Sequence, residues 1–235
     1  MPHITPQRTV DIALGIIRKK ILRGDYPVGS LLPSERTLAE ELGINRLTLR
    51  SALGRLESEK LIQPHHGRGI VVLDYKTHSS IDILAHLNDD TALQGFFALR
   101  RNMAAEAAAQ ACIHASIHQL NELRDICIAQ QQSKDDEEFL YGDIAFTKTL
   151  VTASKNTALQ LLFNSFERIL LGQKEASYKS LKHKEGAIAS YHALIALIRN
   201  RNPLLCRKAI LFPHSLSTEE QTEIQSALSL EYSAQ

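Results

Sequence analysis

Apolar side chains recur at helical spacing from the start of the chain. Across residues 8–23 they stand three or four positions apart, as at Leu14, Ile17 and Ile21. This period predicts an amphipathic helix. The segment 24–29 contains two glycines and a proline, residue types that favour turns, and so ends the helix.

Two shorter helices are predicted next, each with a recognisable start. Ser34 is a suitable N-cap for the first, and Gly43 ends it, because glycine tolerates the left-handed conformation common just past a helix. Asn45 is a suitable N-cap for the second. The apolar stripe of this second helix is Leu49, Ala52, Leu53 and Leu56. Arg46 and Arg50, one turn apart, share a different face of it.

A short hairpin is expected after these helices. Residues 61–63 and 69–72 are extended in pattern, and the loop between them contains glycine and a basic residue. We therefore expect strands to be almost confined to residues 61–73. Two short helices joined by a glycine-containing turn, the second basic on one face, are a helix-turn-helix arrangement, and the hairpin would be its wing.

The pattern changes after Asp74 and becomes almost entirely helical. Amphipathic blocks are predicted at 81–87, 92–113, 116–132, 136–153, 156–172, 185–200, 203–213 and 218–230. The predicted fold is mainly α. It has an N-terminal α+β unit over residues 1–75, a linker over 76–80, and an all-α helical-bundle domain over 81–235.

Composition and charge refine this picture. The chain is 44% hydrophobic and 23% charged, as globular proteins are. No apolar run is long enough for a membrane span, and no signal peptide is evident, so we expect a cytoplasmic protein without membrane contact. Residues 1–75 hold 11 Lys and Arg against 8 Asp and Glu, whereas the remainder holds 16 against 18. A basic front end is compatible with nucleic-acid binding. The three cysteines are expected to be buried thiols.

Two segments of the N-terminal unit carry many characteristic residue types, GDYPVGSLLPSER at 24–36 and LAEELGINRLTLR at 38–50. They resemble G-x-x-x-x-G-x-x-L-P-S-E-R and L-A-x-x-x-G-V-S-R-x-T-V-R, the signatures of the GntR superfamily of bacterial transcription regulators. HGRGIVV at 66–72 completes a resemblance over residues 9–73. It implies a winged helix-turn-helix that binds double-stranded operator DNA.

The resemblance also implies which residues contact DNA. They are Arg36 at the start of the second helix, Asn45, Arg46, Thr48 and Arg50 in the recognition helix, and His66, Gly67 and Arg68 in the wing. Arginine suits these roles because its planar fork pairs with guanine or phosphate. Leu47 departs from the polar residue common there, and either contacts a thymine methyl group or packs. One recognition helix reads few base pairs, so we expect a homodimer on a two-fold site.

The helical domain resembles that of the FadR branch, named FCD, which binds a small-molecule effector. Arg100 falls where many relatives have an effector-facing arginine. Many FCD proteins also bind a divalent metal through one Asp and three His. Asp143, His192 and His214 match three of these positions, whereas Thr147 stands in place of the fourth ligand. The resemblance thus implies a cavity containing these residues, with Arg100 and Thr147 facing the effector.

Alternatives remain open for this domain. One is a site for a divalent ion, zinc or similar, that assists a carboxylate effector. Another is a metal-free pocket for an acyl-CoA, as in FadR-type members. A dimer that binds DNA without any effector is a third. A metal-dependent enzyme is the least favoured, because GxSxG, Walker A, HExxH and GxGxxG motifs are all absent. We therefore expect a regulator rather than an enzyme.

Overall fold

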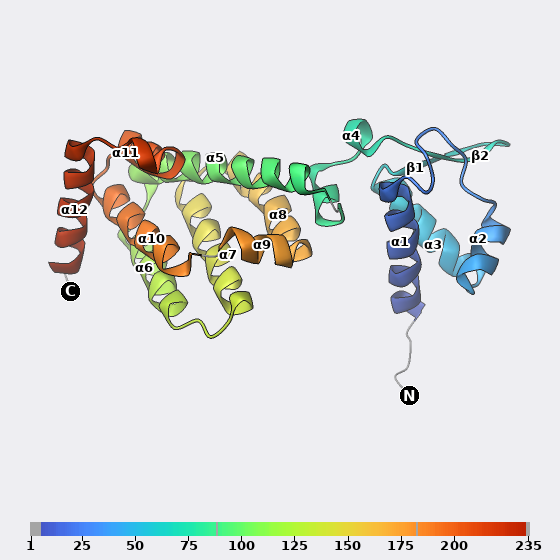
Figure 1. The fold of residues 1–235 in the computed structure, drawn as a ribbon, viewed down its shortest axis with the longest axis horizontal. Coiled ribbons are helices and arrows are strands. Elements are labelled where there is room, and N and C mark those ends of the chain that lie inside the picture. Colours follow the sequence, from blue (N-terminus) through green and yellow to red (C-terminus); the bar gives the residue numbers. More distant parts are fainter. Residues whose placement is uncertain (1–5, 88, 182, 234–235) are drawn as a thin grey trace. The chain divides into compact units, whose positions relative to one another are not determined.

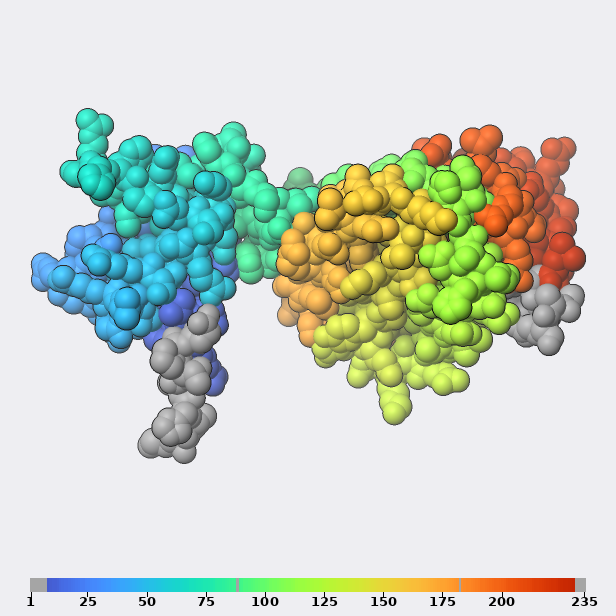
Figure 2. All heavy atoms as spheres, turned by 180° about the vertical axis from the view of Figure 1, so that it is seen from behind, coloured from blue at the N-terminus to red at the C-terminus, as the bar shows by residue number. Residues whose placement is uncertain are grey.

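The computed structural model describes residues 6–87, 89–181 and 183–233. Backbone contacts divide the chain into two compact units, Met1–Asn88 and Asp89–Gln235 (Figure 1). Each unit has its own hydrophobic interior, and side chains fill the spaces between its ribbons (Figure 2).

The first unit begins with three helices and a hairpin. The helices are α1 (Pro6–Arg23), α2 (Glu35–Leu42) and α3 (Arg46–Ser58), and the strands are β1 (Ile62–His65) and β2 (Gly69–Val72). The strands are antiparallel, with Ile62 opposite Val72. Apart from an isolated bridge between Leu31 and Val71, the described residues contain no other β-structure, as predicted.

Local capping sets the start and end of the two short helices. The Ser34 side chain accepts a hydrogen bond from the Thr37 amide, and Asn45 accepts one from Thr48 at 2.8 Å. Gly43 has a φ of 64° and ends α2. These three predicted roles are confirmed. Because the caps define where α3 begins, they also define which side chains stand on its first turn.

The predicted domain boundary is wrong. A short helix, α4 (Tyr75–His78), lies within the expected linker, capped by Asp74, and a 3-10 turn, η1 (Ile81–Ala85), follows. Ile83 and Leu87 are buried in the core of the first unit, so segment 81–87 belongs to that unit and not to the helical domain. Helical periodicity shows that a segment has an apolar face, but not which core this face covers.

The second unit contains eight α-helices among the residues described. They are α5 (Asp90–His114), α6 (Ile117–Gln131), α7 (Asp136–Ala153), α8 (Thr157–Gly172), α9 (Lys174–Ser180), α10 (Lys184–Arg199), α11 (Pro203–Leu211) and α12 (Thr218–Ser233). A 3-10 turn, η2 (Pro213–Ser215), precedes α12. The short helix α9 has no counterpart in the predicted pattern.

Helix α5, with 25 residues, is the longest of the described helices and runs along the top of this unit in the view of Figure 1. It packs against α7, α8, α10 and α11. Many of its buried positions are alanine, including Ala105, Ala108 and Ala111. Small side chains allow neighbouring helices to approach closely, and bulkier residues of those neighbours, such as Phe139 and Phe146, fill the core. None of the described helices is both long and apolar enough to cross a membrane.

Candidate functional site

The N-cap and the first two turns of α3 carry the predicted contact residues of the recognition helix, of which Thr48 is half-buried. Asn45, Arg46 and Arg50 are all exposed. Leu47 is 78% exposed, so it does not pack against the unit's own core. An apolar side chain held in water at the start of a recognition helix is available for contact with a partner.

Two of the predicted DNA-contacting arginines are paired with carboxylates on the protein surface. Arg50 Nε donates to Glu35 Oε2 at 2.8 Å, which joins α3 to α2. Arg36 Nη1 lies 3.1 Å from Glu40 Oε1, one turn along α2. Surface pairs of this kind contribute little net energy, so phosphate or base atoms can replace the carboxylate at small cost.

The hairpin loop presents the predicted wing residues. His66, Gly67 and Arg68 are exposed between β1 and β2. The Arg68 amide donates to the His65 carbonyl at 3.0 Å, and Gly67 has a φ of 72°. A residue with a β-carbon would be strained in this conformation, so the tight turn explains the glycine at the tip.

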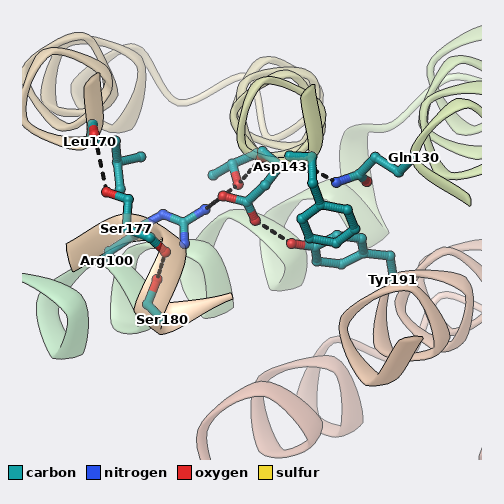
Figure 3. Close-up of polar contacts among 9 residues, drawn as sticks. Arg100, Gln130, Asp143, Leu170, Ser177, Ser180 and Tyr191 are labelled. Atoms are coloured by element: carbon teal, nitrogen blue, oxygen red, sulfur yellow. Dashed lines mark hydrogen bonds and ion pairs between the residues drawn. The ribbon is translucent and has the colours of Figure 1, made fainter. Parts of the chain in front are cut away.

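A polar network connects α5, α7 and α10 in the second unit (Figure 3). Arg100 Nη2 donates to Asp143 Oδ2 at 2.6 Å and to Thr147 Oγ1 at 3.1 Å. Thr147 in turn donates to the backbone carbonyl of Asp143 at 2.9 Å. From the other side, the Tyr191 hydroxyl donates to Asp143 Oδ1. Both carboxylate oxygens of Asp143 are therefore engaged by side chains.

The surroundings keep Tyr191 neutral. Burial raises the pKa of its phenol well above the usual value, and the negative charge of Asp143 adds to this shift. Its ring stacks on Phe146, with centroids 4.1 Å apart and an interplanar angle of 17°. Tyr191 is thus a fixed hydrogen-bond donor that positions the Asp143 carboxylate.

This network lies at the wall of a cavity of about 640 Å³. Arg100, Arg101, Asp143, Thr147, Tyr191 and His214 are among its polar lining residues. Most of the remaining wall is apolar and comes from α5, α7, α10, α11 and the start of the C-terminal segment, as at Phe97, Leu150, Ile210, Leu216 and Ile224. The volume and the mixed lining are typical of small-molecule sites.

The predicted metal-binding set does not assemble. Asp143 and His214 line the cavity, but His192 does not, and its Nε2 lies 3.4 Å from the amide nitrogen of Gln131. Within the part of the chain that the structure describes, no cluster of three or more His, Cys, Asp or Glu side chains is arranged to bind a metal. The prediction that His192 shares the site is therefore wrong, and the residues present do not fit the ion.

Helical geometry explains the error and also reveals a residue that the sequence analysis missed. Ser190, Tyr191, Ala193 and Leu194 line the cavity. At 100° per residue these four positions cover one side of α10, and His192 points to the opposite side. Tyr191 therefore takes the place expected for His192. Projecting 190–194 onto a helical wheel would have shown that His192 cannot share a face with Leu194.

Comparison with known proteins finds a matching family model for each of the two units. Residues 12–72 match the model described as "Bacterial regulatory proteins, gntR family", and residues 96–211 match that of the FCD domain. The "Uncharacterized HTH-type transcriptional regulator Rv0494" of Mycobacterium tuberculosis is 31% identical over 182 residues, 72% of either chain. The chain belongs to the GntR family. It is a transcription regulator with a helix-turn-helix DNA-binding domain and an FCD ligand-binding domain.

Other relatives cover most of the chain. The "Fatty acid metabolism regulator protein" of Pectobacterium atrosepticum is 28% identical over 202 residues, 83% of this chain and 82% of that protein. A solved structure described as "Lar controls the expression of the Listeria monocytogenes agr system and mediates virulence" superposes with a TM-score of 0.60. It is 17% identical and covers 94% of this chain and 96% of its own, a likeness of fold alone.

Proposed function

We propose that this GntR regulator binds a two-fold operator as a homodimer, and that an anionic effector with an apolar body binds in the helical cavity without a metal and alters operator binding. The observation that carries the effector proposal is the state of Arg100. Its Nε is buried and has no hydrogen-bond partner, although its Nη2 is fully engaged by Asp143 and Thr147.

A buried donor without an acceptor is costly, and a ligand oxygen would remove that cost. The charge of Arg100 is already balanced by Asp143, so a ligand anion needs further positive groups. Arg101 lines the same cavity and can supply positive charge, and His214 adds an imidazole that can hydrogen-bond to the ligand. The ligand therefore needs only one anionic end to match the polar groups of the cavity.

The apolar part of the cavity sets the other requirement. Leu150, Ile210 and Ile224 offer no hydrogen-bonding side chains, so they favour a hydrocarbon portion of the ligand. A fatty acid and its coenzyme A thioester both combine an anionic group with such a chain. Relatives named as fatty acid metabolism regulators support this ligand class.

The DNA side of the proposal rests on the exposed residues in the first two turns of α3. Arg46, Leu47 and Arg50 stand together there, and the wing presents Arg68 from the hairpin. We propose that Arg36, Asn45, Thr48, His66 and Gly67 complete the contact surface. An exposed apolar residue between two arginines suits the major groove, where thymine presents a methyl group and guanine two acceptors.

The test first selects the operator from random-sequence DNA and then measures operator binding by fluorescence anisotropy. A long-chain fatty acid, its acyl-CoA and a short dicarboxylate are added in turn. One of the two acyl ligands should change operator affinity, and Arg100→Gln should abolish the response. If none of the ligands changes operator affinity, and Arg100→Gln binds the operator as tightly as the parent does, the result would support a ligand-independent DNA-binding dimer.

His192→Ala separates the metal-free site from a metal site. Because His192 lies outside the cavity, this variant should keep the parent response, and a chelator should change nothing. Loss of the response in His192→Ala or after chelation would overturn the metal-free proposal. A further test incubates the protein with the ligand for a prolonged period. If the ligand is recovered chemically unchanged, this supports regulation rather than catalysis.

A further inference from the structure

Two cysteines from different helices meet in the interior of the second unit. The Sγ of Cys112, near the end of α5, lies 3.3 Å from the Sγ of Cys206 in α11. Both side chains are buried, and the two residues are 94 positions apart in the chain. We propose that Cys112 and Cys206 form a site of reversible oxidation, where a peroxide-class oxidant converts the two thiols into a disulfide that joins α5 to α11.

The geometry brings the pair close to bonding distance. A disulfide bond is about 2.05 Å long, so the two sulfurs need to approach by only about 1.3 Å. The helices are already joined near this point, because Arg207 of α11 pairs with Glu106 of α5. Arg201, just before α11, donates to the carbonyl oxygens of Cys112 and Ala115 at the end of α5. These contacts hold the two backbones in place while the sulfurs approach.

The two thiols are not equivalent. The hydrogen bond from Cys206 lowers the pKa of the Cys112 thiol, burial opposes this shift, and the positive charge of Arg201 contributes to it. The same hydrogen bond, together with burial, raises the pKa of Cys206. A thiolate is the reactive form of cysteine, so Cys112 is the nucleophile of the pair and Cys206 the resolving thiol.

The reaction balances with hydrogen peroxide as the oxidant. The Cys112 thiolate attacks one peroxide oxygen, the O–O bond breaks, and the released hydroxide takes up the proton that Cys112 lost, which leaves a sulfenic acid and water. Cys206 then attacks the sulfenic sulfur, the S–O bond breaks, and a second water molecule leaves with the Cys206 proton. In sum, two thiols and one peroxide give one disulfide and two waters.

The position of the pair links it to the effector cavity. Helix α5 contributes Phe97, Arg100 and Ala104 to the cavity wall, and α11 contributes Ala209 and Ile210. A covalent bond between these helices would restrain their separation. This consequence rests on the proposed function, whereas the oxidation itself does not depend on any effector.

The experiment uses the full chain, reduced, freed of reductant and treated with a small excess of hydrogen peroxide. Remaining thiols are alkylated under denaturing conditions and the peptides are mapped by mass spectrometry. We expect one cross-linked species joining the Cys112 and Cys206 peptides, reversed by dithiothreitol. The closed loop should also raise Tm by on the order of 5 °C.

Cys127 is the matched control. It is buried in α6, and burial raises the pKa of its thiol to about 12. Cys127→Ser should form the same cross-link as the parent, whereas Cys206→Ala should leave Cys112 as a sulfenic acid that dimedone traps. The proposal would be overturned if Cys112 and Cys206 of the parent protein could still be alkylated after treatment with peroxide and, separately, with diamide. Cross-links to Cys127 in equal yield would also overturn it. Because the peptides are mapped in the parent protein, the test does not depend on whether a variant folds. The proposed function is tested separately, by measuring effector affinity on reduced protein.

Discussion

Two arginine–carboxylate pairs, one in each unit, have similar geometry but opposite surroundings. Arg50 Nε lies 2.8 Å from Glu35, with the side chains 67% and 36% exposed. Arg100 Nη2 lies 2.6 Å from Asp143, with the side chains 16% and 1% exposed. Water screens the first pair and stabilises its separated charges, whereas the second pair is held in a medium where an unpaired charge is costly. The first arginine can exchange its partner for DNA, and the second is a fixed part of its site.

Removing the carboxylate from each pair should give the largest difference in the free energy of unfolding between the two units. Asp143→Ala leaves Arg100 largely buried without its counter-ion and Tyr191 without an acceptor, so we expect a loss of about 3–5 kcal/mol in the free energy of unfolding. Glu35→Ala should cost less than about 1 kcal/mol. Chemical denaturation of both variants measures the two values. Equal losses would mean that burial does not distinguish the pairs.

A glycine in each unit extends the contrast from charge to packing. A β-carbon on Gly142 of α7 would lie 2.3 Å from Gln130 Cγ, whereas one on Gly54 of α3 would meet nothing within 4 Å. Gly142→Ala should therefore destabilise the protein by about 1–3 kcal/mol through overpacking. Gly54→Ala should stabilise it by roughly 0.5–1 kcal/mol, since alanine favours helices. Thermal unfolding compares them, and a stabilising Gly142→Ala would contradict the close contact.

DNA affinity should respond to the exposed arginines. Arg46→Ala and Arg50→Ala should each weaken operator binding by about 1–3 kcal/mol if they contact a guanine edge. Arg50→Ala should leave the free energy of unfolding almost unchanged, because its ion pair is exposed. Anisotropy titrations at several salt concentrations provide the measurement. If both variants bind the operator as tightly as the parent protein does, these residues do not belong to the contact surface.

The smallest expected effect concerns Leu47. Because this side chain is 78% exposed, Leu47→Ala should not alter thermal stability. It should reduce discrimination for thymine at one position of each half-site by roughly 1 kcal/mol, through loss of a methyl contact. Selection from random DNA with parent and variant shows the change. An identical selected sequence would indicate that Leu47 does not contribute to recognition.

Local signals in the sequence were sufficient for the helix-turn-helix and the hairpin of the first unit. Ser34, Asn45 and Gly43 act within a few residues of their own positions, so their roles as caps follow from residue type alone. The exposed face of α3 likewise follows from the period of its apolar stripe. The hairpin is local too, since its partners stand within a dozen residues of each other. These features need no information about distant parts of the chain.

The cavity depended on tertiary structure. The resemblance to FCD domains implied Arg100, Asp143, Thr147 and His214, which do line one cavity. It did not show that the carboxylate of Asp143 is occupied by Arg100 and a tyrosine. The placement of segment 81–87 and the meeting of Cys112 with Cys206 were also decided by packing between distant segments. A helical period specifies which side chains share a face, but only the packing of helices decides what that face meets.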